Sequence, residues 1–304
     1  MNKLTAIICL AVLIIMSGMT GSCSLARNKV VVISLSGPIQ YENSTSLFFG
    51  GGAITPELVR TQLERAKNDG RVRAIVLQIN SPGGSVAASQ EIVNLLEQVN
   101  MPVVVSMSDL AASGGYYISA GADKIVALPG TLTGSIGVIS ELPNLKGFFD
   151  KLGINMQVIA SGEHKDMYAG FRDLTPEERA IEQEMTDQLY AQFVQVVAKG
   201  RHLSEDKVRA LATGQLYTGT QAKQLGLVDE LGGLQTAIDE AAKLASTSKP
   251  EVEYYEPTTP SILNDLLGLS LQKLRNLVQP ASLSAQDIIL LDTLTNPYPQ
   301  PEYR

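Results

Sequence analysis

The feature that most constrains the fold is an alternation of two hydrophobic patterns between residue 28 and about residue 246. Short apolar runs rich in β-branched residues, typical of buried strands, alternate with segments whose apolar residues recur at helical spacing. We expect strands at residues 30–35, 72–79, 102–107, 124–128, 136–139 and 156–160. Strands that alternate with amphipathic helices indicate sheets covered by helices, and therefore an α/β fold.

Helix starts are marked by capping residues. Thr55 with Pro56, Ser204 and Thr218 each precede a helical pattern, and a further helix is expected over residues 87–99. The longest predicted helix opens with the capping box at Thr175 and runs to Lys199, where Gly200 is expected to stop it. A last helix follows the glycine pair at 232–233 and reaches about residue 245.

The chain divides into three parts. Residues 1–27 form an N-terminal segment, residues 28–246 a main domain, and residues 247–304 a tail with a linker, a leucine-rich stretch at 262–278 and a proline-rich end. The tail is expected either to pack as an amphipathic helix or to reach a groove of the main domain. In the second case the segment 287–291, an aspartate followed by four apolar residues, would occupy the groove, and the enzyme itself could trim the tail.

The N-terminal segment predicts export. Between Leu4 and Ser22 no residue is charged, and these 19 residues are just long enough to cross a bilayer as a helix. An uncleaved signal anchor, a lipoprotein signal cleaved before Cys23 and a simple cleaved signal peptide all fit. Each interpretation places residues 28 onward on the extracytoplasmic side of the cell membrane.

Composition excludes several functions. The net charge is −7 without any basic run, so the sequence offers no electrostatic support for binding nucleic acid. The two cysteines, Cys9 and Cys23, both lie in the N-terminal segment, which excludes a disulfide framework or a cysteine-bound zinc in the main domain. We expect no cofactor and no metal.

Two segments could carry hydrolytic chemistry. Ser113 lies between small residues after a predicted buried strand and before a helical pattern, where backbone N–H groups can stabilise an anion. The glycines at 83 and 84 lie at a strand-to-helix turn, which is typical of oxyanion or phosphate sites. An N-cap serine and an ordinary turn explain the same residues without chemistry. No P-loop is present, because no Gly-Lys-Ser/Thr follows.

The choice of base is narrow. The chain has two histidines, and His202 is expected in a solvated connection, so a Ser/His/Asp triad could use only His164. Lysine is the other candidate, since burial can lower the pKa of an amine until it is neutral and able to accept a proton.

Several motifs together resemble the signal peptide peptidase A family, in its short, single-repeat form. The matching residues are 81–84 (SPGG), 111–117 (AASGGYY), 133–138 (TGSIGV), 165–166 (KD), 217–222 (YTGTQA) and 225–229 (LGLVD). They follow the family's order and spacing over residues 30–245. The resemblance implies an α/β fold of the caseinolytic-protease/crotonase type, built of repeated βαβ turns.

The resemblance also implies the site of a serine protease. Ser113 matches the nucleophile, Lys165 the general base 52 residues further on, and Ser135 the serine that orients the lysine. Gly114 and Gly83 match the oxyanion donors, with Gly84 as the alternative to Gly83.

The family also suggests partners. It implies a membrane-anchored, ring-shaped homo-oligomer in which each subunit holds its own dyad and degrades released signal peptides and related apolar peptides. Two alternatives use the same fold: a crotonase-like acyl-CoA enzyme, and a non-catalytic membrane scaffold.

Overall fold

The central element is a largely parallel sheet. The computed structural model describes residues 27–42 and 52–255 and the backbone of 302–303. In the sheet β7 is followed by β6, β4, β2, β1 and β9, while β5 pairs with β4 and with β8. The strands are β1 (Lys29–Ser36), β2 (Val72–Ser81), β4 (Val103–Ala112), β5 (Lys124–Ala127), β6 (Leu132–Gly134), β7 (Leu216–Thr218), β8 (Glu230–Leu231) and β9 (Glu251–Tyr255).

The middle of this sheet is buried on both faces. β1, β2 and β4 are parallel and in register, with Val32 beside Val76 and Leu77 beside Val105. Their side chains are apolar on both faces, as strands covered by helices on both sides require. This confirms the predicted α/β class.

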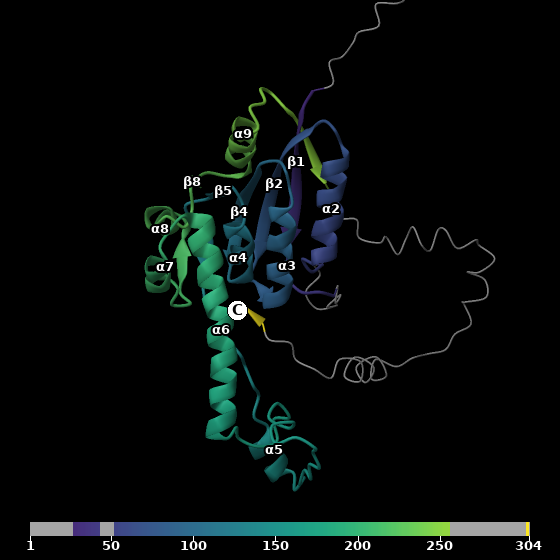
Figure 1. The fold of residues 1–304 in the computed structure, drawn as a ribbon, viewed down its shortest axis with the longest axis vertical. Coiled ribbons are helices and arrows are strands. Elements are labelled where there is room, and N and C mark those ends of the chain that lie inside the picture. The colour runs from purple at the N-terminus through teal and green to yellow at the C-terminus, as the bar shows by residue number, and fades with distance from the viewer. Residues whose placement is uncertain (1–26, 43–51, 256–301, 304) are drawn as a thin grey trace, which may run out of the picture.

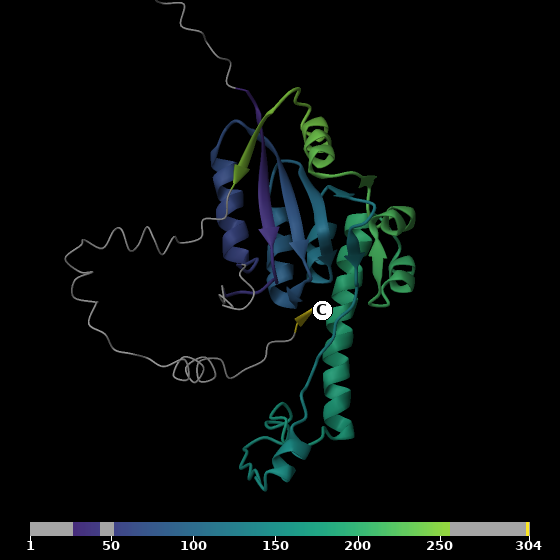
Figure 2. The ribbon, with the colours of Figure 1, turned by 180° about the vertical axis from the view of Figure 1, so that it is seen from behind.

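Helices cover the two faces unequally. Apolar residues of α2 (Pro56–Asn68), α3 (Val86–Glu97), α4 (Gly114–Ala120) and α6 (Pro176–Arg201) form the larger core with one face. On the other face, α9 (Leu234–Leu244) packs on Val30, Val76 and Val104 (Figures 1 and 2). The short helices α7 (Glu205–Leu211) and α8 (Gly219–Leu225) lie beside β7, at the end of the sheet.

Helix α6 corrects one prediction. Gly200 does not stop the helix, which continues to Arg201 and ends at the left-handed residue His202. A Cβ on Gly200 would lie 1.7 Å from the carbonyl oxygen of Ala120, so the glycine lets α6 approach the end of α4 closely. The residue therefore serves packing between two helices rather than helix termination.

Three strand assignments also differ from the predictions. Residues 136–139 and 156–160 belong to no strand of the described part of the chain, although the carbonyl of Ile136 accepts a 3.1 Å hydrogen bond from the N–H of Gly214. Conversely, β9 lies beyond the predicted domain boundary at residue 246. It pairs with β1, Val31 beside Glu253, so the folded unit extends at least to Tyr255.

Residues 139–174, which we call the arm, leave the body of the molecule. The arm contains α5 (Lys146–Lys151) and returns to the sheet through α6, whose N-terminal half extends with it away from the sheet (Figures 1 and 2). Many of its large apolar side chains are exposed, among them Phe148, Leu152, Ile154, Val158 and Ile159. A single subunit therefore leaves an apolar surface open to solvent.

The end of the chain returns to the body. The two-residue strand β10 (Glu302–Tyr303) pairs antiparallel with β3 (Gly84–Ser85), with Tyr303 opposite Gly84. The predicted tail segment 287–291 lies outside the described residues, as do residues 1–26. Among the described helices none is both long and apolar enough to cross a bilayer.

Candidate active site

Ser113 lies at a strained turn where β4 passes into α4. Its φ of 53° and ψ of −121° belong to a region that residues with a Cβ rarely adopt. Ser113 is fully buried, and its Oγ has no hydrogen-bond partner among the described residues. A strained serine between a strand and a helix, with an uncommitted hydroxyl, is typical of a nucleophile. The fold thus places Ser113 between a strand and a helix, as predicted. Ser113 occupies the N-cap position of α4, but its side chain makes no capping hydrogen bond, so capping does not account for the hydroxyl.

The glycine turn after β2 lies directly against Ser113's helix. A Cβ on Gly114 would lie 3.3 Å from the amide nitrogen of Gly84, which places that amide beside the start of α4. Gly84 has a φ of +148°, and a Cβ there would lie 2.1 Å from the carbonyl oxygen of Ile39. Only glycine fits this position without moving backbone.

The backbone N–H and carbonyl of the neighbouring Gly83 are both already hydrogen-bonded within the protein. Its N–H donates a 3.1 Å hydrogen bond to the Oγ of Ser81, and its carbonyl accepts from the N–H of Ile39 at 2.9 Å. Of the two candidate glycines, Gly84 is therefore the better placed oxyanion donor beside Gly114. The role of Ser81, which holds the loop through its side chain, was not foreseen, although it belongs to the 81–84 motif.

Ser135 is brought to the same place by the adjacent strand. The N–H of Ser113 donates to the carbonyl of Gly134 at 2.9 Å, so Ser135 directly follows the residue that is hydrogen-bonded to the backbone of Ser113. Ser135 itself has a positive φ of 48° and is half-buried. Ser113, Gly84, Gly114 and Ser135 thus converge at one edge of the sheet.

Lys165 does not join them in the single chain. It lies on an exposed turn of the arm, and the preceding His164 is 3.6 Å from Glu178 in the first turn of α6. Near the other end of α6, Phe193 packs on Tyr117, one turn after Ser113. At 1.5 Å per residue, these two levels of α6 are separated by roughly 20 Å.

That separation exceeds the reach of a lysine side chain. The expectation that each subunit brings its own Ser113 and Lys165 together is therefore not met. The reason is the arm, which carries Lys165 away from the sheet (Figure 1).

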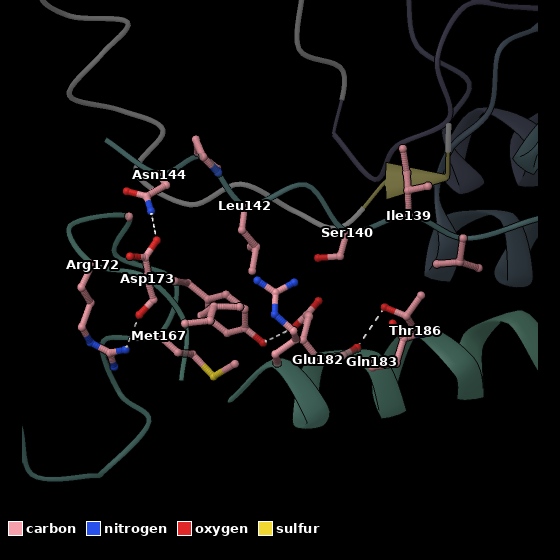
Figure 3. A pocket seen from close by; sticks show the side chains of 16 residues that line it. Ile139, Ser140, Leu142, Asn144, Met167, Arg172, Asp173, Glu182, Gln183 and Thr186 are labelled. Atoms are coloured by element: carbon pink, nitrogen blue, oxygen red, sulfur yellow. Dashed lines mark hydrogen bonds between the residues drawn. The ribbon is translucent and has the colours of Figure 1, made fainter. Parts of the chain in front are cut away.

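A cavity of about 500 Å³ separates the arm from α6. Figure 3 shows Ile139, Met167, Arg172 and Thr186 on its walls, with Glu182 reaching in from α6. Glu182 accepts a 2.7 Å hydrogen bond from Tyr168, which ties the arm to the helix. This cavity is distinct from the edge of the sheet where Ser113 lies.

Comparisons with known proteins agree with this geometry. The model of Peptidase family S49 matches residues 96–248, and that of Clp protease matches residues 53–133. The chain is 43% identical to a provisionally named protease of Synechocystis over 66% of this chain and 74% of the relative. It is 36% identical to an Enterococcus faecium protein provisionally named signal peptide peptidase SppA, over 80% of this chain and 71% of the relative. Protease 4 of Haemophilus influenzae is 36% identical, but only 40% of that protein is covered.

The fold and the site define a serine hydrolase built on a Clp-protease-like α/β domain. Within that class the chain belongs to peptidase family S49 and is a serine protease similar to signal peptide peptidase A and Protease 4.

Proposed function

We propose that this protein is a membrane-anchored endopeptidase that cleaves apolar peptides with Ser113 as nucleophile and Lys165 as general base. The observation that carries the proposal is the strained, buried turn at Ser113, packed against the Gly84 amide and bonded to Gly134. Membership of family S49 favours peptide hydrolysis over acyl-CoA chemistry on the same fold.

The chemistry is acyl transfer. The neutral Nζ of Lys165 takes the proton from Ser113 Oγ while Oγ bonds to the peptide carbonyl carbon, whose oxygen becomes an oxyanion. The N–H groups of Gly114 and Gly84 donate to that oxyanion. Lys165 then gives the proton to the leaving amine as the C–N bond breaks. A water attacks the acyl-enzyme through the same base, which releases the peptide and restores Ser113.

The base comes from a neighbouring subunit. The support is geometric: Ser113 lies on the body, whereas Lys165 lies on an arm that extends away from it and exposes apolar side chains. Head-to-tail contacts that close into a ring would bury those side chains and bring each arm to the next subunit's Ser113. Closure of the ring would also remove water from the amine, as a lysine base requires.

Substrates bind as an added strand. The support is the pairing of β10 with β3, because it shows that the edge beside Gly84 accepts an extended segment in antiparallel register. Released signal peptides and membrane-derived fragments have the extended, apolar character that such an edge suits. The N-terminal segment would hold the enzyme at the membrane where these peptides arise, with the catalytic domain on the extracytoplasmic side.

Subunit mixing tests this proposal. Ser113→Ala and Lys165→Ala should each abolish hydrolysis of an apolar reporter peptide. When both variants are co-expressed with different tags and purified as mixed rings, about a quarter of the sites should combine an intact serine with a neighbour's lysine. Recovery of roughly that share of activity supports a shared dyad. Mixed rings without activity would place both residues in one subunit, and an active Lys165→Ala would remove the lysine from the mechanism.

A further inference from the structure

The residues on either side of Lys165 both lie near one buried carboxylate, one of them directly and the other through an arginine. Glu178, in the first turn of α6, is only 1% exposed. Its Oε1 lies 3.6 Å from Nδ1 of His164, which precedes Lys165. Through Arg172 it is joined to Asp166, which follows Lys165.

Arg172 makes this connection through two edges of its planar guanidinium group. It donates to Glu178 at 2.7 and 2.6 Å and to Asp166 at 3.0 and 2.6 Å, which are two bidentate pairs. Charge-assisted, two-point contacts of this kind fix orientation as well as distance. Donation from Arg172 holds the pKa of Glu178 at about 2 and lowers that of Asp166, so both carboxylates are ionised wherever the enzyme would work.

Helix capping does not explain why residue 178 is a charged glutamate. Glu178 completes a capping box with Thr175, but the same chain builds a second capping box at Thr218 with the neutral Gln221. An amide is therefore sufficient for the cap, and the negative charge of Glu178 has another use. Its contacts show which: Arg172 pairs with Glu178 and with Asp166, and Nδ1 of His164 lies 3.6 Å from Glu178, so the carboxylate faces the segment that presents Lys165.

We propose that Glu178, acting through Arg172, is the positioning residue that fixes the direction in which Lys165 projects from the arm. This rests on the proposed function, in which Lys165 is the base. Asp166 is held through Arg172 and His164 lies close to Glu178, so the turn is anchored on both sides of Lys165. Lys165 itself is exposed and can meet an incoming active site. Such positioning matters because a misplacement of about 1 Å at a reacting group can cost on the order of 100-fold in rate.

The sharpest variant is Glu178→Gln, which keeps the capping box and removes the charge. We expect kcat per active site, counted by titrating Ser113 with a fluorophosphonate, to fall about 10- to 100-fold while KM changes less than about threefold. The ascending limb of the kcat–pH profile should move to higher pH, because water around an amine that leaves the closed site favours its charged form.

Asp166→Asn provides the second variant, since its side chain is 20% exposed and tolerates substitution if Glu178→Gln fails to fold. It should lower kcat in the same way by a smaller factor. The matched control is Asp150→Asn, which removes an exposed ion pair with Lys146 on the same arm and should leave kcat, KM and the pH limb unchanged.

The outcomes separate the two proposals. Wild-type kcat and pH limb in both Glu178→Gln and Asp166→Asn, beside an inactive Lys165→Ala, would overturn the positioning role and leave the protease mechanism intact. An equal loss in Asp150→Asn would also overturn it, because the effect would then belong to the arm in general. An active Lys165→Ala would overturn both.

Discussion

Gly84→Ala tests whether the amide beside Ser113 is held by backbone packing. The new methyl group would lie 2.1 Å from the carbonyl oxygen of Ile39, about 1.3 Å short of ordinary contact. Its φ of +148° adds strain of about 1–3 kcal/mol for a residue with a Cβ. Relief of the contact requires the glycine turn to move by about 1 Å, which at an oxyanion donor should lower kcat on the order of 100-fold.

The assay combines chemical denaturation with steady-state hydrolysis of a reporter peptide. Gly84→Ala should lose about 3 kcal/mol of unfolding free energy, since overpacking alone typically costs about 1–3 kcal/mol. Gly70→Ala is the matched control, because a Cβ there meets nothing within 4 Å, and its stability should change by less than about 1 kcal/mol. Wild-type stability and kcat in Gly84→Ala would refute the packing of this turn against Ile39.

Three further predictions follow from other parts of the structure. Gly200→Ala should lower the unfolding free energy by about 1–3 kcal/mol or more in denaturant titrations, because its Cβ would lie 1.7 Å from Ala120's carbonyl oxygen; an unchanged midpoint contradicts that contact. The midpoint temperature of thermal unfolding should stay constant from pH 7 to about 5 and fall between about pH 4.5 and 2. The folded state keeps the pKa of Glu178 and of Asp69 at about 2, whereas in the unfolded chain both carboxylates become protonated at higher pH. A midpoint that does not change with pH would contradict this prediction. Intact masses should show C-terminal shortening in wild type but not in Ser113→Ala, since β10 already pairs beside Gly84; identical masses would leave β10 as packing.

Local signals in the sequence predicted the body of the fold well. Capping at Thr55, Thr175, Ser204 and Thr218 marks real helix starts, and the apolar runs of β1, β2 and β4 are real strands. These features depend on residues close together in the chain. A long-range contact, such as that of Gly200 with Ala120, leaves no local trace, so the glycine was interpreted as a helix stop.

The candidate site was predictable in part for the same reason. Ser113, Gly84, Gly114 and Ser135 follow strands that end at one sheet edge, and their motifs are contiguous. The position of Lys165 depends instead on the path of the arm. Residues 136–139 and 156–160 resemble strands because they are apolar, but Ile136 is buried in the main core, whereas the exposure of Val158 and Ile159 in the single chain follows from the arm's departure from the body.

The most direct test of the central claim is labelling by a fluorophosphonate probe that reacts with activated serines. The intact full-length protein should gain one probe mass, and peptide mapping should place it on Ser113. Ser113→Ala should take up none, while Ser135→Ala should still be labelled. Labelling that persists in Ser113→Ala, or a wild-type protein that remains unlabelled under conditions where it hydrolyses peptides, would contradict the assignment of Ser113 as nucleophile.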